Sequence, residues 1–274
     1  MAALNFRVDN GIGFIEFDEP DSKVNVLNTA AMAEFNRILD DLSGKIKPMP
    51  KALIITSKKD GQFIAGADIK EIENISSVAE AQEKAAKGKE IFEKLSNLNL
   101  VSVAVINGVV LGGGLELALA SRYRLATFSD KVKLGLPEVR LGVIPGFGGT
   151  IRLPKIVGLT KALGMILSGD AISGIDGLKS GLVDRLIPEN RMLEESINFV
   201  NEVLEKKNQR FLNTVQEILV EGKSQKREMR LTGRTRGNKI VNFDGESSLT
   251  GKIITVKITR VKPWALDGEV INDQ

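Results

Sequence analysis

The sequence predicts an α/β core followed by a small all-β barrel, and three observations support this division. Strand and helix patterns alternate through residues 1–206, which is typical of α/β proteins. Residues 213–274 contain short β-rich runs separated by Gly and Asn turns. From Lys206 onward the chain carries 14 Lys and Arg against 8 Asp and Glu, whereas the 274-residue sequence has a net charge of +3. We therefore expect two domains, 1–206 and 213–274, with a boundary near 207–213.

The N-terminal elements follow from hydrophobic periodicity. Residues 4–18 alternate apolar and polar side chains in two runs around a DNG turn, which predicts a β-hairpin. Apolar residues at helical spacing predict a helix at about 28–43, and the apolar run 52–56 is typical of a buried strand. A second round follows, with a helix at about 79–97, a strand at 101–106 and a Gly-rich turn that leads into a helix from Gly114.

The second half contains three more helical stretches and then the barrel. The helical period returns at about 160–168, 175–181 and 190–206. The β-rich runs that follow are VQEILVEG, MRLTGRT, KIVNF, KIITVKIT and GEVI. Their spacing predicts an antiparallel barrel of five strands.

The composition excludes several kinds of chemistry. There are no cysteines, so disulfides, thiolate nucleophiles and cysteine-bound metals are excluded. There are no histidines either, which removes imidazole bases and the commonest metal ligand. Any acid–base chemistry must therefore use Asp, Glu, Lys, Tyr or backbone groups, and carboxylates are the leading candidates.

The sequence favours a cytoplasmic protein. Its N-terminus, MAALNFRVDNGIGFIEF, lacks the basic and long apolar regions of a secretory signal. The apolar run 101–120 is long enough to span a bilayer, but it contains Asn107, three glycines and Glu116. We therefore expect no membrane span.

Two Gly-flanked segments suggest a site for an oxyanion. VVLGGGLELALA (109–120) places three glycines at a strand-to-helix turn, where a ligand can approach the backbone and the N–H groups have no intrahelical partners. Glu116 follows in the first helical turn, where the helix dipole alone would favour an acid. QFIAGADIK (62–70) offers a second set of free N–H groups, and two such donors on one carbonyl oxygen would form an oxyanion hole.

Five stretches resemble the enoyl-CoA hydratase/isomerase (crotonase) superfamily. They are DSKVNVLN, FIAGADIKEI, INGVVLGGGLELALA, LGLPEVRLGVIPGFGGTIRLP and LTKALGMILSGDAISGIDGLKSGLVDRLIP. Within the superfamily they look most like the hydratase part of the multifunctional α-subunit of fatty-acid β-oxidation. The resemblance covers about residues 4–206 and implies a spiral core of ββα units.

The resemblance assigns roles by position. It implies that the amides of Ala67 and Gly113 hold a thioester oxygen and that Glu116 and Glu138 are the two catalytic carboxylates. It also implies a binding segment for coenzyme A and the acyl substrate, formed by Lys23, Asp68, Ile69 and Lys70. No metal or redox cofactor is implied. Coenzyme A is part of the substrate and is not counted as a cofactor. For Glu138, a helix-capping role after Pro137 is the alternative.

The presence of both acids favours hydration of a 2-enoyl-CoA thioester to the 3-hydroxyacyl-CoA. Relatives that only move double bonds commonly keep one of the two acids, so isomerisation is the second enzymatic possibility. The stretch IPGFGGTIRLP (144–154) lacks the Gly-Lys-Ser/Thr ending of a phosphate-binding P-loop. We interpret it as a loop that shapes the site beside Glu138.

The C-terminal region resembles a TRAM domain, the small RNA-binding barrel of tRNA methylthiotransferases. The resemblance covers 213–271, and its most specific parts are LTGRTRGNKIVNF, ITVKIT and PWALDGEV. It implies RNA contacts, with tRNA as a partner, through Arg234, Arg236, Lys239 and Phe243. Basic residues interleaved with aromatics suit phosphate contacts and base stacking. Further candidates are the basic residues Lys223, Lys226, Arg227 and Arg230 and the aromatic Trp264.

This fusion leaves two other possibilities open. One is an RNA-binding protein whose crotonase part is only a scaffold, and the other is an inactive fusion. For the basic residues of the barrel, solvation without a ligand is the alternative to RNA contact. Methylthiotransferase chemistry is excluded because it needs cysteines. Crotonase relatives are usually trimers and continue past the position of Lys206 with further helices. The barrel takes that place here, so a homotrimer is only an expectation from the family.

Overall fold

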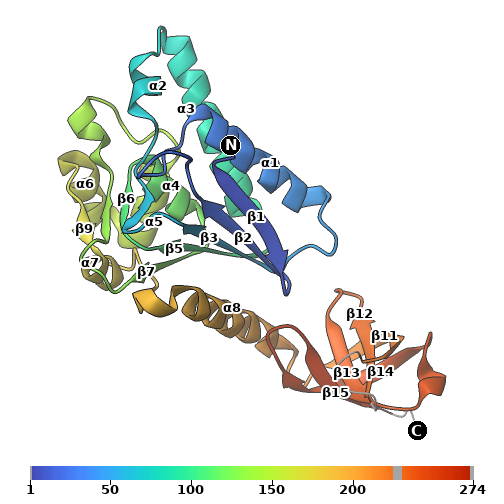
Figure 1. The fold of residues 1–274 in the computed structure, drawn as a ribbon. Helices are drawn as coiled ribbons and strands as arrows, with labels where there is room; N and C mark the ends of the chain where they lie inside the picture. The colour runs from blue at the N-terminus through green and yellow to red at the C-terminus, as the bar shows by residue number, and fades with distance from the viewer. Residues whose placement is uncertain (1, 225–229, 272–274) are drawn as a thin grey trace. The chain divides into compact units, whose positions relative to one another are not determined.

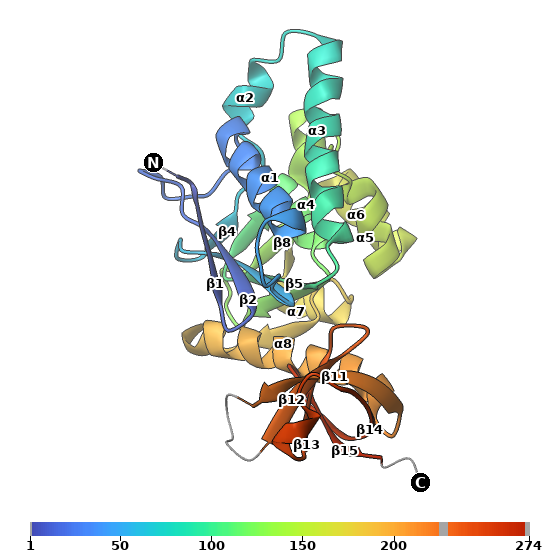
Figure 2. The same cartoon turned by 90° about the vertical axis from the view of Figure 1, so that its right-hand side faces the viewer.

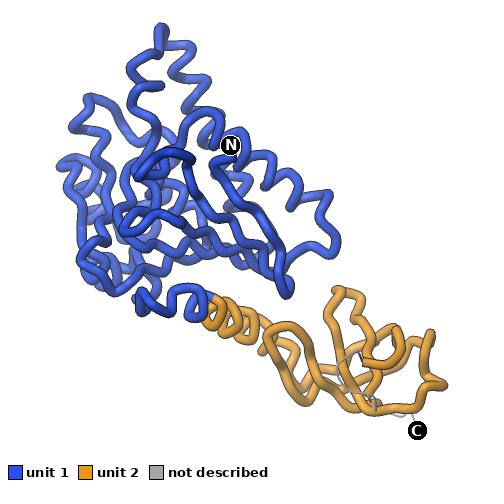
Figure 3. Tube along the Cα trace, viewed as in Figure 1, with its two compact units in different colours: residues 1–196 blue, residues 197–274 orange. Residues whose placement is uncertain are grey.

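The computed structural model describes residues 2–224 and 230–271 and forms two compact units, Met1–Ser196 and Ile197–Gln274 (Figure 3). The helix α8 (Met192–Asn208) runs through the division between them. Each unit has its own apolar core. The domain boundary predicted at 207–213 remains a prediction.

The first unit is built on a six-stranded sheet with the order β1-β2-β3-β5-β7-β10 (Figure 1). Its strands are β1 (Leu4–Asp9), β2 (Ile12–Phe17), β3 (Ala52–Ser57), β5 (Val101–Ile106), β7 (Tyr123–Thr127) and β10 (Arg185–Ile187). β1 and β2 form the predicted antiparallel hairpin, with Leu4 opposite Phe17, and all other neighbours run parallel. Every residue of β5 is buried, as expected for a parallel strand covered on both faces.

A second, four-stranded sheet has the order β4-β6-β8-β9. It comprises β4 (Gln62–Ile64), β6 (Val109–Leu111), β8 (Lys133–Gly135) and β9 (Ile172–Ser173). The first three strands run parallel, and β9 pairs antiparallel with β8. Strands of two or three residues are too short to show periodicity, and the sequence analysis does not identify them. Together the two sheets and their helices form the predicted α/β core.

The helices of the first unit are α1 (Thr29–Gly44), α2 (Ile69–Glu73), α3 (Val78–Asn97), α4 (Gly113–Ala120), α5 (Gly149–Val157), α6 (Leu159–Ser168) and α7 (Gly174–Lys179). Most of them begin near the predicted positions, but α5 replaces part of the loop expected at 144–154. Short 3₁₀ helices are η1 (Pro137–Leu141), η2 (Glu189–Arg191), η3 (Gln209–Phe211) and η4 (Ser247–Leu249). Asn28 caps the N-terminus of α1, and its side-chain oxygen accepts a hydrogen bond from the amide of Ala31 at 2.8 Å. α1 packs against α3, and α3 packs against α4 (Figures 1 and 2).

Helix α4 is buried at every residue. A helix that is apolar on nearly all sides belongs inside a protein core. Its single acid therefore lies in the interior of the first unit.

The second unit contains a closed five-stranded barrel with the order β11-β12-β13-β15-β14. The strands are β11 (Val215–Lys223), β12 (Arg230–Thr235), β13 (Ile240–Asp244), β14 (Ile253–Val261) and β15 (Leu266–Val270). Closure removes the exposed sheet edges. The expectation of a wholly antiparallel barrel is wrong at one pair, because β13 and β15 run parallel.

Candidate active site

Three parallel strands bring the predicted site residues to one edge of the second sheet. β4 pairs with β6, and β6 pairs with β8, all in the same direction. Parallel strands end at a common edge, so the segments that follow them lie close together. Those segments carry, in chain order, Ala67, Gly113 and Glu138.

The amides of Ala67 and Gly113 are available to a ligand. Within residues 2–224 and 230–271, neither amide donates a hydrogen bond. Gly113 is the first residue of α4, where an N–H has no intrahelical acceptor. The preceding glycines, Gly66 and Gly112, have φ values of 119° and 50°, which favour glycine. A Cβ on Gly112 would lie 3.8 Å from Gly66 Cα, so the two turns approach closely.

Glu116 lies in the first turn of α4 and is 1% exposed. Its Oε1 accepts hydrogen bonds from the amides of Phe147 at 2.8 Å and Gly149 at 2.7 Å. A Cβ on Gly149 would lie 3.0 Å from this oxygen, so the loop needs glycine there. None of the described residues donates a hydrogen bond to Oε2. One oxygen is thus fixed, and the other can act on a ligand.

Glu138 is the second residue of η1 and is half-buried. A Cβ on Gly112 would lie 3.1 Å from Glu138 Oε1, which places this carboxylate beside the turn that leads to Gly113. In the part of the chain that the structure describes, Glu138 Oε2 is buried and has no hydrogen-bond partner. A buried carboxylate oxygen without a partner is uncommon in a stable fold and suggests a functional role.

Burial raises the pKa of both acids. Burial raises the pKa of Glu116 to about 7; the amide of Gly149 opposes this rise, and the charge of Glu138 adds to it. Burial also raises the pKa of Glu138, and a hydrogen bond donated by its own backbone amide opposes this rise. Because the charge of Glu138 disfavours the charged form of Glu116, Glu116 can retain a proton near neutral pH. Such a pair contains one acid and one base at the same time.

The residues predicted to contact coenzyme A lie on two adjacent segments. The amide of Leu27 donates to the carbonyl oxygen of Gly66 at 2.8 Å, which joins the segment after Lys23 to the turn before α2. Asp68 begins α2, and its Oδ1 accepts the amide of Lys70 at 2.9 Å. The predicted contacts comprise the exposed Lys23, Ile69 and Lys70 and the half-buried Asp68.

In the barrel, the prediction that Phe243 is an exposed aromatic is wrong. Phe243 is 0% exposed and belongs to the core of the barrel. The buried positions of β13 alternate, with Val241 and Phe243 both inside. Phe243 therefore cannot stack on an RNA base. The other aromatic candidate, Trp264, is half-buried, and its indole N–H donates to Asn201 Oδ1 at 2.9 Å.

The predicted RNA-binding arginines are paired with acids on the neighbouring strand. Arg234 Nε lies 2.9 Å from Glu221 Oε1, and Arg236 Nη2 lies 2.9 Å from Glu217 Oε2. Both acids come from β11. The pairs reduce the local positive charge that RNA phosphates would need.

Lys239 is partly withdrawn from the surface. Its Nζ donates to Asn208 Oδ1 at 2.8 Å and lies 5.7 Å from the centre of the Phe211 ring. Burial lowers the pKa of Lys239, as does nearby positive charge. The basic candidates Lys226 and Arg227 lie outside the described residues.

The backbone donors that hold Glu116 are not predicted from the sequence. The stretch 144–154 is expected to be a loop, but α5 begins at Gly149, and the amides of Phe147 and Gly149 bind Glu116. Arg152 is not predicted either, and its Nη1 donates to the carbonyl oxygen of Phe147 at 2.7 Å. The double glycine in this stretch is a signal for close backbone approach, but it does not indicate which side chain approaches.

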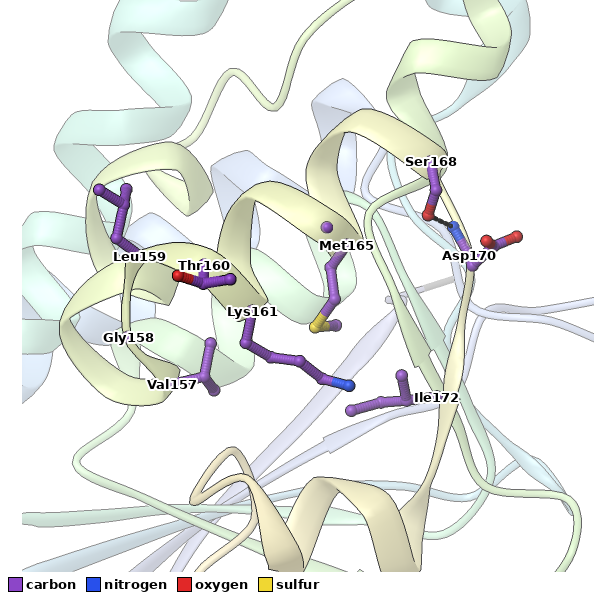
Figure 4. A pocket seen from close by; sticks show the side chains of 10 residues that line it. Val157, Gly158, Leu159, Thr160, Lys161, Met165, Ser168, Asp170 and Ile172 are labelled. Carbon is purple, nitrogen blue, oxygen red and sulfur yellow. Dashed lines mark hydrogen bonds between the residues drawn. The ribbon is translucent and has the colours of Figure 1, made fainter.

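A cavity of about 660 Å³ lies away from these residues, at the junction of α5 and α6 (Figure 4). The figure shows Lys161 extending across it toward Ile172. The lining residues are Val157, Gly158, Leu159, Thr160, Lys161, Gly164, Met165, Ser168, Asp170 and Ile172. None of them is a predicted site residue. We therefore place the candidate site where strands β4, β6 and β8 end, and not at this cavity.

Two further features concern the described residues only. Among them, no three acidic side chains come together in a way that could hold a metal ion. The helices of the described ranges are each too short or too polar to cross a bilayer.

The fold and the comparisons with known proteins agree on a class, the crotonase-type α/β proteins. An enoyl-CoA hydratase from Geobacillus kaustophilus superposes with a TM-score of 0.68 at 32% identity, covering 73% of each chain. An enoyl-CoA hydratase from Bacillus anthracis gives a TM-score of 0.66 at 29% identity, covering 72% of this chain and 74% of the other.

The chain belongs to the enoyl-CoA hydratase/isomerase family, whose model matches residues 7–240. The fatty acid oxidation complex subunit alpha of Shewanella loihica is 41% identical over 216 residues, which is 78% of this chain and 30% of that protein. The corresponding subunit of Vibrio campbellii is 42% identical over 196 residues, or 70% of this chain and 27% of that protein. The chain thus spans less than a third of the length of these relatives.

Proposed function

We propose that the protein adds water to 2-enoyl-CoA thioesters and forms 3-hydroxyacyl-CoA in fatty-acid β-oxidation. The observation that carries this proposal is the convergence of two unpaired amides, Ala67 and Gly113, with two acids of raised pKa, Glu116 and Glu138. The family and the names of the relatives support the same reaction.

The amides of Ala67 and Gly113 stabilise the charge that develops on the thioester oxygen. Attack of water at the β-carbon of the conjugated thioester moves electron density onto the thioester oxygen. Two preorganised N–H donors, from Ala67 and Gly113, stabilise this oxyanion, and removal of one donor of this kind typically slows a reaction by about 10²–10³. The thioester carbonyl would therefore lie between the two turns.

The two carboxyl groups move the protons. The ionised member accepts a proton from water as the oxygen bonds to the β-carbon. The protonated member donates a proton to the α-carbon as the enolate collapses, so no proton is gained or lost overall. Glu116, with a pKa of about 7, is suited to exchange a proton near neutral pH. This chemistry needs no metal or redox cofactor.

Substrate binding is assigned to the exposed segment next to the turns. Lys23 and Lys70 would neutralise the phosphates of coenzyme A, and Asp68 and Ile69 would lie along the bound thioester. The positions of these residues on adjacent segments support this assignment.

The test is the hydration of crotonyl-CoA by wild type, Glu116→Gln and Glu138→Gln. Each substitution keeps the side-chain volume and removes one acid, and we expect kcat to fall by about 10²–10⁴ in each case. Equal rates in the three proteins would overturn the proposal. A 3-enoyl-CoA assayed in parallel separates hydration from isomerisation, which requires proton transfer between two carbons and no water.

The alternative function, RNA binding by the barrel with an inactive core, has less support. The barrel carries positive charge, but Arg234 and Arg236 are paired with acids and Phe243 is buried. A cytoplasmic location, a homotrimer and a tRNA partner remain predictions.

A further inference from the structure

The loop that holds Glu116 donates two hydrogen bonds to it from residues only two positions apart. It consists of Phe147, Gly148 and Gly149, and its two outer amides donate to Glu116 Oε1 at 2.8 and 2.7 Å. A displacement of this loop would move both donors together. The position of the carboxylate therefore depends on the contacts that fix the loop.

The ring of Phe147 provides the first of these contacts. It meets the Phe92 ring edge-on, with centroids 5.5 Å apart and an interplanar angle of 85°. It also lies against Gly88 of α3, where a Cβ would come within 2.3 Å of the ring. This anchor is apolar and fixes the loop to the core without affecting its charge.

The side chain of Arg152 provides the second contact. Its Nη1 donates to the carbonyl oxygen of Phe147 at 2.7 Å, and its own amide donates to the carbonyl oxygen of Gly148 at 2.9 Å. The guanidinium also covers Gly148, where a Cβ would lie 2.3 Å from Nη1. Arg152 thus binds the loop through both its backbone and its side chain.

We infer that Arg152 is a positioning residue for the hydration reaction. Its guanidinium fixes the carbonyl of Phe147 and thereby aims the two loop amides at Glu116. The inference rests on the proposed function of Glu116 and adds a residue that acts through it. The stretch IPGFGGTIRLP (144–154) contains Arg152, but the sequence alone does not indicate its role.

The charge of Arg152 lowers the pKa of Glu116, as do the loop amides that Arg152 positions. Glu116 faces two charged side chains, Glu138 from η1 and Arg152 from α5, and Arg152 also faces Glu93 from α3. The Arg152 cation lowers the pKa of Glu116, against the larger effects of burial and Glu138. Loss of the cation should therefore raise the pKa of Glu116 and move the pH–rate profile toward higher pH.

The first experiment compares Arg152→Gln and Arg152→Lys with wild type. Because a misplacement of about 1 Å can cost about 10²-fold in rate, we expect Arg152→Gln to lower kcat by about 10- to 100-fold. KM should stay within about twofold, because the proposed thioester contacts are the amides of Ala67 and Gly113 and not the side chain of Arg152. Arg152→Lys keeps the cation and should restore the midpoint of the pH profile. Arg191→Gln, an exposed arginine that pairs with Glu194, is the matched control and should behave as wild type.

A second readout does not depend on activity. Glutamate labelled with ¹³C at the side-chain carboxyl allows NMR titration of Glu116, with Glu116→Gln identifying the signal. A higher apparent pKa of Glu116 in Arg152→Gln than in wild type supports the inference. An unchanged titration together with an unchanged pH–rate profile overturns it. If the wild type does not hydrate crotonyl-CoA, the proposed function fails, and the titration still decides the role of Arg152.

A variant of the loop covers the case in which Arg152→Gln does not fold. Gly148→Ala keeps Arg152 but introduces a Cβ into the space of its guanidinium, at a residue with φ of 104°. We expect kcat to fall while circular dichroism and KM stay close to wild type. Wild-type kcat and a wild-type Glu116 titration in this variant would contradict the inference.

Discussion

The protonation of Glu116 connects the proposed chemistry to the stability of the fold. Burial raises its pKa from the ordinary value of 4.5 to about 7 in the folded protein. Between these two pH values the unfolded chain releases a proton that the folded protein retains. The free energy of unfolding therefore falls as the pH rises through this window, and the loss is complete above about pH 7.

Glu116→Gln should remove this pH dependence. Because a shift of one pKa unit corresponds to about 1.36 kcal/mol, the variant should gain about 3 kcal/mol relative to wild type between pH 4 and pH 8. Urea unfolding at pH 4, 5, 6, 7 and 8 measures the difference, and the exposed Glu83→Gln on α3 is the control. A difference between Glu116→Gln and wild type that is constant across this range would show that the pKa of Glu116 does not change on folding.

Single residues differ in how far the sequence could predict them. Glu116 stands out as a carboxylate after three glycines, and the resemblance of this stretch to the crotonase superfamily implies its catalytic role. The amides of Phe147 and Gly149 are not predictable, because a backbone donor leaves no side-chain signature. Their acceptor, Glu116, lies 31 residues from Phe147 and 33 residues from Gly149 in the sequence. The error at Phe243 was avoidable, since alternation in KIVNF places Val241 and Phe243 on one face of the strand.

At the scale of elements, the site requires helix α4 to lie directly against strand β4. Gly114 makes this possible, because a Cβ there would lie 2.3 Å from the carbonyl oxygen of Ile64. A backbone atom cannot move aside as a flexible side chain can. The close approach of these two elements keeps the turns of Gly66 and Gly112 together.

Gly114→Ala should therefore destabilise the core and reduce hydration. Overpacking of this kind costs about 1–3 kcal/mol, and any relief must move α4 away from β4. Gly164→Ala on α6 is the matched control, since a Cβ there meets nothing within 4 Å. The control should be more stable by about 0.5–1 kcal/mol because alanine favours a helix. Denaturant midpoints and crotonyl-CoA hydration measure both variants, and equal stabilities would contradict the packing argument.

The elements themselves were predictable where they are long and periodic. The sequence analysis places helices near α1, α3, α6 and α8 and identifies the β1–β2 hairpin and β3 and β5. It does not identify β4, β6 and β8, whose ends carry the site, because pairing with distant neighbours stabilises them. The parallel pair β13 and β15 is also invisible in the sequence, since local runs do not determine strand direction.

At the scale of the whole molecule, each of the two compact units has its own apolar core. One core contains buried side chains of the α/β unit, and the other, among the described residues, contains nine buried residues of the barrel. Sequence periodicity and charge indicate two parts, but a helix that continues from Met192 to Asn208 does not reveal where one unit ends. Separate cores predict that each unit can lose its structure while the other remains folded.

Phe243→Ala tests this independence. Removal of a fully buried phenylalanine typically costs about 3–5 kcal/mol, a large part of the stability of a small barrel. We expect an early unfolding transition for the barrel in calorimetry, a second transition at the wild-type temperature for the core, and unchanged kcat with crotonyl-CoA. Ile253→Ala, at a site 69% exposed on β14, is the control and should leave both transitions in place. If Phe243→Ala instead lowers both transitions together and abolishes hydration, the two units fold as one cooperative system, and the barrel contributes directly to the stability of the proposed site.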